Sequence, residues 1–546
     1  MLYVCSVMTE EIRISTMTDQ QSKQKVEQTV CRNPATGEIL GYSPLTDLEK
    51  LEQIISRAKL AQKSWSKLDV RERARHMLQV RNYLVQHGER ISEVISRDNG
   101  KTQVDALSTE VLPAAMAVNY YTRHAKKFLK TRYICPGNIL LLNKISKVVR
   151  MPYGVVGVIS PWNYPFSIPF SEVVMAILAG NAVVVKTASA TQWVGRILEK
   201  CFLAADLPEG IFNYVNIPGR IAGSALLRNG IGKLFFTGSV SVGKQLMAEA
   251  GESLTPLVLE LGGNDAMLVC EDADIFRATS GAVWAGFQNS GQSCAGVERV
   301  YVHEKVYHSF LQLLKEKVEA LRVGFKDDFE IDIGAMTTER QVSKVKSHLD
   351  DALAKGARVY ARSAEPEGKS SNTFFPAMVL TEVNHDMLLM QEETFGPLLG
   401  VMKVKDMDEA VALANDSHLG LTGSVWSRDR CRAEGLARQI QAGVVTINDH
   451  LVSHGLAETP WGGVKQSGIG RSHGAIGFDE MTQPQVIVHD ILPFARQNIW
   501  WHPHGKKVYE GLLGAIRFLY STSIRQRVKG FYRLLKILPR YFSTRA

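Results

Sequence analysis

Two short segments about thirty residues apart indicate the chemistry of this chain. Residues 289–296, Asn-Ser-Gly-Gln-Ser-Cys-Ala-Gly, set Cys294 among small residues, and residues 257–263 place Glu260 near the end of an apolar run. A thiol needs an uncrowded approach and a nearby group that handles charge before it can act as a nucleophile. A carboxylate at the end of a buried strand can have a raised pKa and act as a general base near neutral pH. The pair therefore predicts covalent catalysis at a carbonyl carbon.

Each of these residues also has a plainer interpretation. The chain has seven cysteines, most of which are expected to be inert, buried side chains, and Glu260 alone could cap a helix or join an ion pair. The cysteines are scattered and no Cys-x-x-Cys pair occurs, so the sequence indicates neither a disulfide framework nor a zinc site, and no metal is expected. Reduced thiols favour a cytoplasmic protein.

The elements that would position this chemistry are a parallel sheet and its crossover helices. Short, largely apolar runs alternate with helix-length segments between Tyr153 and Gly263, as expected for strands buried on both faces. The predicted strands are Val155–Ile159, Ala182–Lys186, Phe212–Asn216, Leu234–Thr237 and Leu257–Leu261. A doubly wound α/β domain follows, and such sheets bind nucleotides beyond the carboxyl ends of their strands.

A Gly-Ser turn stands where the usual Gly-x-Gly-x-x-Gly fingerprint is expected. Residues 236–243, Phe-Thr-Gly-Ser-Val-Ser-Val-Gly, leave a predicted strand and enter a predicted helix, whose first backbone amides could hold a pyrophosphate. The turn could equally be an ordinary helix cap. Elsewhere, residues 48–97 and 109–129 predict amphipathic helices, and a second α/β region runs over about 282–474.

Seven motifs follow one another in order along residues 32–491. They are Pro161–Pro165, Lys186, Phe236–Ser239, Leu259–Gly263, Gly291–Cys294, Glu392–Pro397 and Trp461–Arg471. The series resembles that of the large superfamily of NAD(P)-dependent aldehyde dehydrogenases. The resemblance implies an α/β fold with a Rossmann-like cofactor domain, an α/β catalytic domain and a small β element for oligomerisation.

The resemblance also implies a catalytic cycle. Cys294 would attack the aldehyde carbon to give a thiohemiacetal, which loses a hydride to the nicotinamide and becomes a thioester. Glu260 would deprotonate the water that hydrolyses the thioester. Asn163 would donate its side-chain amide to the oxyanion beside the backbone amide of Cys294, a contact typically worth about 2.7–4 kcal/mol. Asn163 could otherwise only shape its turn.

The cofactor contacts implied by the resemblance begin with Lys186 on the adenosine ribose and Glu393 on the nicotinamide-side ribose. The remaining contacts are Trp162, Ser189, Gly238, Ser239, Gly262 and Phe395. Lys186 could instead be a surface residue, and Glu393 one of a solvated acidic pair. Relatives that prefer NAD often carry Glu where Ser189 stands here, and losing that carboxylate relieves repulsion of a 2′-phosphate. The expected cofactor is NAD or NADP.

By the same resemblance, the substrate pocket is lined by Trp162, Tyr164, Phe287, Gln288 and the loop Leu451–Glu458. Its aromatic residues favour an apolar aldehyde. No arginine stands at these positions to pair with a substrate carboxylate, which disfavours semialdehydes.

The resemblance divides the chain into ranges with different roles. They are a flexible leader (1–31), a cofactor-binding domain (32–133 and 153–281), a catalytic domain (282–478), oligomerisation strands (134–152 and 479–495) and a tail (496–546). Residues Cys135–Val149 and Gln485–Asp490 would join copies into a homodimer or homotetramer. The run Ile139–Leu142 could instead be a core strand.

The tail carries nearly all of the net charge of the chain. Residues 496–546 hold eleven Lys or Arg and one acid, Glu510, a net +10 in a chain of +9, so residues 1–495 sum to −1. Apolar residues at helical spacing alternate with these charges, a pattern typical of a basic amphipathic helix on an anionic membrane. The tail is as apolar as it is basic, which argues against nucleic acid as its partner. The alternative is a helical extension packed on a neighbouring subunit.

Two other functions stay open at this stage. In an acylating dehydrogenase, coenzyme A rather than water would resolve the thioester, but such relatives tend to lack a base like Glu260. In a non-catalytic scaffold or tail-mediated interaction protein, the fold would be kept without the reaction. Such a scaffold has no chemical need for Cys294, Glu260, Asn163 and Glu393.

Overall fold

The computed structural model describes residues 27–326, 329–365 and 371–543. The chain forms two compact units, one of Met1–Leu129 with Pro152–Gln483 and one of Lys130–Met151 with Pro484–Ala546. Most of the expected leader lies outside the described residues. Its last residues, predicted to be flexible, belong instead to strand β1 (Gln28–Arg32), which pairs antiparallel with β2 (Ile39–Pro44).

The first unit contains a six-stranded sheet. Its order is β19 (Gly468–Ile469), β9 (Leu257–Glu260), β8 (Lys233–Thr237), β5 (Val155–Ile159), β6 (Ala182–Lys186) and β7 (Phe212–Tyr214). The short β19 runs antiparallel to β9, and the other pairings are parallel, as predicted. Every residue of β5, β6 and β8 is buried, which explains their continuous apolar sequences.

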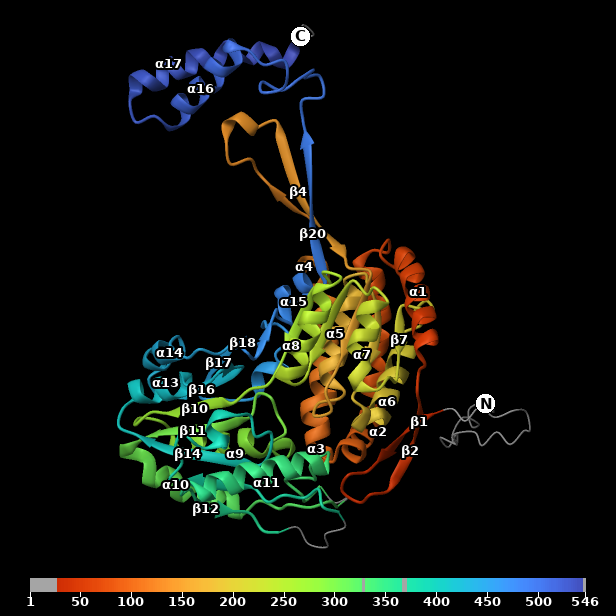
Figure 1. The fold of residues 1–546 in the computed structure, drawn as a ribbon, viewed down its shortest axis with the longest axis vertical. Coiled ribbons are helices and arrows are strands. Elements are labelled where there is room, and N and C mark those ends of the chain that lie inside the picture. Colours follow the sequence, from red (N-terminus) through yellow and green to blue (C-terminus); the bar gives the residue numbers. More distant parts are fainter. Residues whose placement is uncertain (1–26, 327–328, 366–370, 544–546) are drawn as a thin grey trace, which may run out of the picture. The chain divides into compact units, whose positions relative to one another are not determined.

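Helices on this sheet share one hydrophobic core with its strands (Figure 1). They are α1 (Leu48–Trp65), α2 (Val70–Asn99), α4 (Leu112–Phe128), α5 (Ser167–Leu178), α6 (Gln192–Leu203), α7 (Gly219–Arg228) and α8 (Val240–Gly251). The predicted helical stretch 48–97 is broken at Asp69, whose side chain and Glu72 form a capping box that starts α2. Between α2 and α4, α3 (Gln103–Ala106) leads into a π-helix over Leu107–Val111.

A seven-stranded sheet forms the rest of the first unit. Its order is β12 (Arg358–Arg362), β13 (Met378–Thr381), β14 (Leu398–Val404), β11 (Val297–His303), β10 (Asp265–Val269), β16 (Thr422–Trp426) and β17 (Val444–Ile447). Along β10, Ala266 and Leu268 enter one core while Met267 and Val269 enter another, so both faces are covered.

The helices of the second sheet divide between those two cores. One core takes in α9 (Ile275–Phe287) and α10 (Glu304–Glu319), and the other takes in α11 (Glu339–Ala354), α12 (Leu388–Gln391), α13 (Met407–Asn415) and α14 (Arg430–Ala437). Strand β10 precedes residue 282, where the catalytic domain was expected to begin, and α9 starts before that residue. We therefore propose that the cofactor-binding domain ends near Asn264, between β9 and β10.

The first unit also contains a short strand pair and one more helix. The pair β15 (Leu419–Gly420) and β18 (Val464–Lys465) is antiparallel. Helix α15 (Gly474–Glu480) inserts Phe478 into the core of the six-stranded sheet.

The second unit combines a three-stranded sheet with two helices. The sheet contains β20 (Thr482–Asp490), β4 (Lys144–Pro152) and β3 (Arg132–Ile134). The run Ile139–Leu142 is a turn that begins with a 3₁₀ helix and leaves three of its four side chains exposed, so its interpretation as a core strand was wrong. The tail forms two helices, α16 (Lys506–Tyr520) and α17 (Ile524–Leu535), rather than one.

Candidate active site

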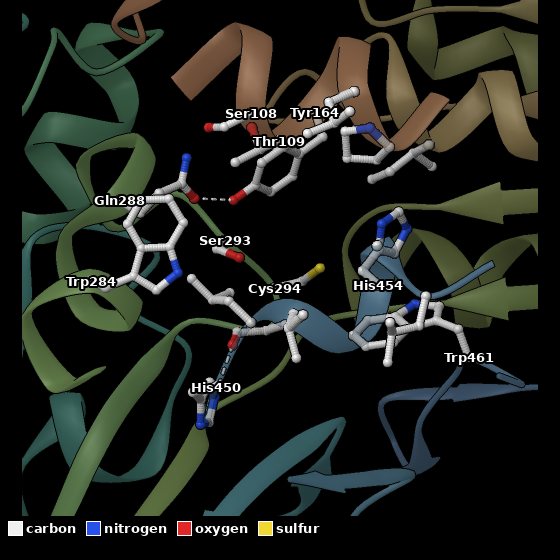
Figure 2. A pocket seen from close by; sticks show the side chains of 18 of the residues that line it. Ser108, Thr109, Tyr164, Trp284, Gln288, Ser293, Cys294, His450, His454 and Trp461 are labelled. Carbon is white, nitrogen blue, oxygen red and sulfur yellow. Dashed lines mark hydrogen bonds between the residues drawn. The ribbon is translucent and has the colours of Figure 1, made fainter. Parts of the chain in front are cut away.

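Cys294 lies between α9 and β11, in the wall of a cavity of about 350 Å³. Figure 2 shows its sulfur pointing into this cavity, with Tyr164 on one side and His454 and Trp461 on another. The thiol is therefore open to a substrate that enters the cavity.

The loop before Cys294 is held in an unusual conformation. Asn289, Ser290 and Gly291 have φ values of 53°, 56° and 68°, and each non-glycine residue in this region costs about 1–3 kcal/mol. Gly291 admits no side chain, because a Cβ there would lie 2.3 Å from the carbonyl oxygen of Gly396. Such strain is typical of sites whose geometry serves a function.

The Cys294 thiol is a weak acid in this setting. Burial raises its pKa well above the ordinary value, and the carboxyl groups of Glu393 and Glu260 raise it further. The resting side chain is therefore protonated at neutral pH, so a base must remove its proton for it to attack a carbonyl.

Glu260 ends strand β9 and is 5% exposed. Burial raises its pKa to about 7, although hydrogen bonds from Ser472 and Trp461 act in the opposite direction. Ser472 Oγ donates to Oε1 at 2.5 Å and Trp461 Nε1 donates to Oε2 at 2.9 Å. A carboxyl group with this pKa can take and release protons near pH 7.

A second buried carboxyl group, Glu172 on α5, was missed by the sequence analysis. Burial, and then the charge of Glu260, raise its pKa well above the ordinary value, so Glu172 keeps its proton while Glu260 ionises. The available signal was a single carboxylate inside the otherwise apolar run Ile168–Leu178. We interpret Glu172 as an uncharged neighbour of the ionised Glu260.

Asn163 is buried beside the loop that carries Cys294. Its side-chain Nδ2 donates to the carbonyl oxygen of Gln292 at 3.1 Å, and Nδ2 of Asn289 donates to the carbonyl oxygen of Asn163 at 3.0 Å. The structure thus brings Asn163 next to the cysteine loop from a position 131 residues earlier in the chain. One N–H of its amide remains for a further acceptor.

The carboxylate of Glu393 contacts the turn Gly262–Gly263, which follows Glu260. Its Oε1 accepts a hydrogen bond from the backbone N–H of Gly263 at 3.0 Å, and a Cβ on Gly262 would lie 2.9 Å from its Oε2. Burial raises the pKa of Glu393. The glycine therefore leaves the carboxylate of Glu393 close to the main chain beyond β9.

The remaining predicted cofactor residues gather at the carboxyl ends of the strands of the six-stranded sheet. The strand order reverses between β5 and β8, and ligands bind at such switch points. Trp162 follows β5 and packs edge-on against Phe395, with ring centroids 5.4 Å apart. Gly238 and the exposed Ser239 follow β8, where Ser239 begins α8 without a capping bond from its side chain.

Lys186, the last residue of β6, is the buried cation of this group. It is 4% exposed, and burial lowers its pKa to about 8. Its Nζ lies 3.6 Å from the position that a Cβ on Gly219, the first residue of α7, would take. Ser189 is exposed three residues further on. A buried amino group beside uncapped helix amides at the switch point fits the ribose and phosphates of a dinucleotide.

The cavity beside Cys294 is lined mainly by apolar side chains. Tyr164, Gln288 and parts of the loop Leu451–Glu458 line it, as predicted. Trp162 lies instead against Phe395, and Phe287 belongs to a core of the seven-stranded sheet, so those two predictions were wrong. Lining residues that were not predicted include Ser108, Thr109, Leu112, Pro113, Met116, Ile168 and Trp284.

The cavity carries little charge. Burial lowers the pKa of both His450 and His454 to about 4, so both are neutral at pH 7. Asp449 is exposed and is the one carboxylate among the lining residues that the structure describes, and these include no Arg or Lys. The site is therefore suited to a neutral, apolar ligand.

The chain matches the family model described as "Aldehyde dehydrogenase family" over residues 20–487. It is 38% identical over 496 residues to 4,4'-diapolycopene aldehyde oxidase of Methylomonas sp, with 91% of this chain and 92% of that protein covered. A solved succinate-semialdehyde dehydrogenase from Burkholderia pseudomallei is 32% identical, with a TM-score of 0.81 and 85% and 95% of the two chains covered. A betaine aldehyde dehydrogenase from Staphylococcus aureus, solved in complex with NAD+, is 28% identical, with a TM-score of 0.82 and 87% and 96% covered.

Proposed function

Since the chain belongs to the aldehyde dehydrogenase family and is an NAD(P)-dependent aldehyde dehydrogenase, we propose that it converts apolar aldehydes into carboxylic acids through a thioester on Cys294. The observation that carries this proposal is a largely apolar cavity, with no Arg or Lys among its described lining residues and with Cys294 in its wall. Trp461 also lines this cavity and donates a hydrogen bond to Glu260. A carboxyl group with a pKa of about 7 therefore lies next to the wall of the cavity.

The first step joins the enzyme to the aldehyde. Cys294 Sγ bonds to the carbonyl carbon, the thiol proton passes to Glu260, and the carbonyl electrons move onto the oxygen. The free N–H of Asn163 stabilises this oxyanion, which is where a hydrogen-bond donor accelerates the reaction. A dinucleotide held at Lys186 and Glu393 would supply the acceptor for the hydride that leaves the same carbon, and Cys294 would then carry a thioester.

The second step releases the acid. Glu260, after giving its first proton to solvent, takes a proton from a water molecule as that water attacks the thioester carbon. The tetrahedral intermediate collapses, the carbon–sulfur bond breaks, and Cys294 leaves and is protonated again. The pKa of Glu260 near 7 lets one carboxyl group serve both steps at neutral pH.

The substrate that fits this cavity is a long, apolar aldehyde. The Methylomonas relative is by its name an oxidase of 4,4'-diapolycopene aldehyde, and the Burkholderia relative is by its name a succinate-semialdehyde dehydrogenase. The carboxylate of a semialdehyde would meet Asp449 and, among the described lining residues, no compensating cation. We therefore propose lipid-derived or other long-chain aldehydes.

Rates of cofactor reduction with decanal and with succinate semialdehyde test this substrate class. Each buried CH₂ adds about 0.8 kcal/mol, so several of them should raise kcat/KM for decanal by about 100-fold or more over the semialdehyde. Butanal, which has the semialdehyde's length without its carboxylate, separates length from charge. Equal or faster turnover of succinate semialdehyde would contradict the proposal.

We propose that Ser189 permits NADP as well as NAD. A carboxylate at this exposed position beside Lys186 would repel the 2′-phosphate of NADP. Ser189→Glu should lower kcat/KM with NADP by about tenfold, the effect of 1.4 kcal/mol. Ser189→Gln, of similar size and without charge, should keep NADP turnover. Unchanged NADP turnover in Ser189→Glu would argue against the role of Ser189.

We also propose that the C-terminal helices bind an anionic membrane surface. Helices α16 and α17 pack closely where Gly514 and Gly530 meet, and share a small core with neighbouring residues of the tail. Large apolar side chains remain exposed, namely Tyr509, Ile516, Tyr520, Ile524, Val528, Phe531, Tyr532 and Leu535. Arg525, Arg527 and Lys529 are exposed among them. Exposed apolar and basic residues together favour a membrane interface.

Among the described residues, no helix is long and apolar enough to cross a membrane. The attachment that we propose is peripheral, on a cytoplasmic protein. We also propose that the three-stranded sheet joins copies into a dimer or tetramer, because its Tyr133, Val486 and Val488 expose more than half of their surface.

Flotation with vesicles tests the membrane proposal. Each basic residue near an anionic surface contributes about 1 kcal/mol, so replacing Arg525, Arg527 and Lys529 by Gln should weaken binding roughly 100-fold. Deletion of residues 497–546 should abolish it. The matched control replaces Lys50, Lys63 and Lys67, exposed on or just after α1, by Gln. If deletion leaves flotation unchanged but alters the oligomeric state, the tail packs on a neighbouring subunit instead.

A further inference from the structure

A fully buried ion pair lies beneath the segment that carries Asn163. Lys101 and Glu110 both have side chains with no exposed surface, and Lys101 Nζ lies 2.7 Å from Glu110 Oε1. Removing both charges from water is costly, and such a pair often contributes less to stability than apolar side chains of the same size would. Stability alone is therefore a poor explanation for it.

The other side-chain hydrogen bonds that the structure gives for the pair reach the segment Asn163–Ser167. Lys101 Nζ donates to the carbonyl oxygen of Asn163 at 2.8 Å and lies 4.2 Å from the centre of the Tyr164 ring. Glu110 Oε2 accepts the backbone N–H groups of Phe166 at 2.7 Å and Ser167 at 3.2 Å. The pair thus holds this segment at both of its ends.

Glu110 lies within the π-helix Leu107–Val111. A π-helix is rare and often occurs at functional sites, because its wider turn shifts the side chains that follow. Here Ser108 and Thr109 line the substrate cavity while Glu110 is buried in the pair. One short element therefore supplies both the cavity wall and the support of the segment opposite Cys294.

We infer that Lys101 and Glu110 are positioning residues for the oxyanion contact, which fix the main chain of Asn163 so that its amide stays aimed at the substrate oxygen. The inference rests on the role proposed for Asn163. The carbonyl oxygen of Asn163 accepts from Lys101 on one side and from Asn289, in the cysteine loop, on the other. Without Lys101, this carbonyl oxygen keeps only the hydrogen bond from Asn289, which moves with the cysteine loop.

A double-mutant cycle separates positioning from general stability, because coupled residues give non-additive losses. Asn163→Ala should lower kcat by about 10²–10³. The pair variant Lys101→Met/Glu110→Gln removes both charges of the pair and keeps an acceptor for the N–H groups of Phe166 and Ser167. It should lower kcat by about tenfold to 100-fold with little change in KM. When the pair variant is combined with Asn163→Ala, kcat should fall by no more than about twofold further.

Two controls keep the result interpretable. Lys233→Met disrupts another ion pair, in which Lys233 is buried and Glu480 is partly exposed. Any loss it causes should be the same with and without Asn163→Ala. Alkylation of Cys294 by iodoacetamide forms no oxyanion, so its rate should be unchanged in the pair variant. Melting temperatures show that each variant is folded.

The outcomes distinguish the two proposals. If Asn163→Ala loses kcat but the pair variant does not, or if their losses multiply, the positioning role is wrong and the role of Asn163 stands. If the pair variant slows alkylation as much as turnover, its effect is structural and the inference fails. If Asn163→Ala turns over normally, the oxyanion role of Asn163 fails, and the inference fails with it.

Discussion

Replacing Cys294 by alanine should abolish aldehyde oxidation. Alanine cannot form the bond on which hydride loss depends, so kcat/KM should fall by about 10⁴-fold or more, as when other enzymes lose a nucleophile. The measurement is the formation of reduced cofactor with decanal and each of NAD and NADP. Cofactor binding should be unchanged, because the predicted contacts lie at the strand ends of the six-stranded sheet.

Two other cysteines serve as controls for this result. Cys431 is exposed on α14, and Cys270 is buried just after β10. Neither lines the cavity beside Cys294, so Cys431→Ala and Cys270→Ala should keep their turnover. Turnover by Cys294→Ala within about tenfold of the parent, a difference of only 1.4 kcal/mol, would rule out a covalent mechanism through this residue.

Replacing Glu260 by glutamine should slow both steps of the reaction and should slow hydrolysis of the thioester the most. A positioned general base contributes about 10²–10⁴-fold, so steady-state kcat should fall by that factor. Glutamine can keep the contacts with Ser472 and Trp461 but cannot take a proton from water. If solvent can accept the thiol proton slowly in the first step, a single burst of reduced cofactor should precede the slow steady state.

The pH dependence of the parent enzyme follows from the same carboxyl group. Glu260 acts as a base only when ionised, and its pKa is about 7, so kcat should rise with pH, reach half its maximum near 7 and then level off. The Glu260→Gln variant should lose this rise. A rise that persists in the variant would assign it to another group.

Stability gives an internal control for the glutamine variant. Because the pKa of Glu260 is raised on folding, the stability that its proton contributes is present below about pH 4.5 and is lost as pH rises through 7. Glutamine never ionises and so avoids that loss. The variant should therefore melt no lower than the parent at about pH 8, which would show that lost turnover is not lost folding.

Much of the fold could be predicted because its signals are local. The strands β5, β6 and β8 are buried along their whole length, and their continuous apolar runs therefore stand out in the sequence. Glu260 and Lys186 end such strands, so their position at the edge of the sheet followed directly. The interruption between α1 and α2 at Asp69 was harder to predict, because the apolar spacing continues across the capping box.

What escaped prediction depends on contacts between distant segments. Met116 and Trp284 line the same cavity from helices that are far apart in the sequence, and nothing local marks either one as a pocket residue. The ion pair of Lys101 and Glu110 likewise makes its hydrogen bonds to the distant segment Asn163–Ser167. The two tail helices were read as one because the apolar spacing resumes after Ser521, where the helix stops.

The most direct test of the thioester mechanism is the mass of the Cys294 peptide after the Glu260→Gln enzyme has reacted with decanal and NAD or NADP. The expected result is a stable adduct on Cys294 with the mass of the aldehyde less two hydrogens, formed only when the oxidised cofactor is present and removed by hydroxylamine. Absence of any adduct while reduced cofactor forms, or an adduct on another cysteine, would contradict the mechanism.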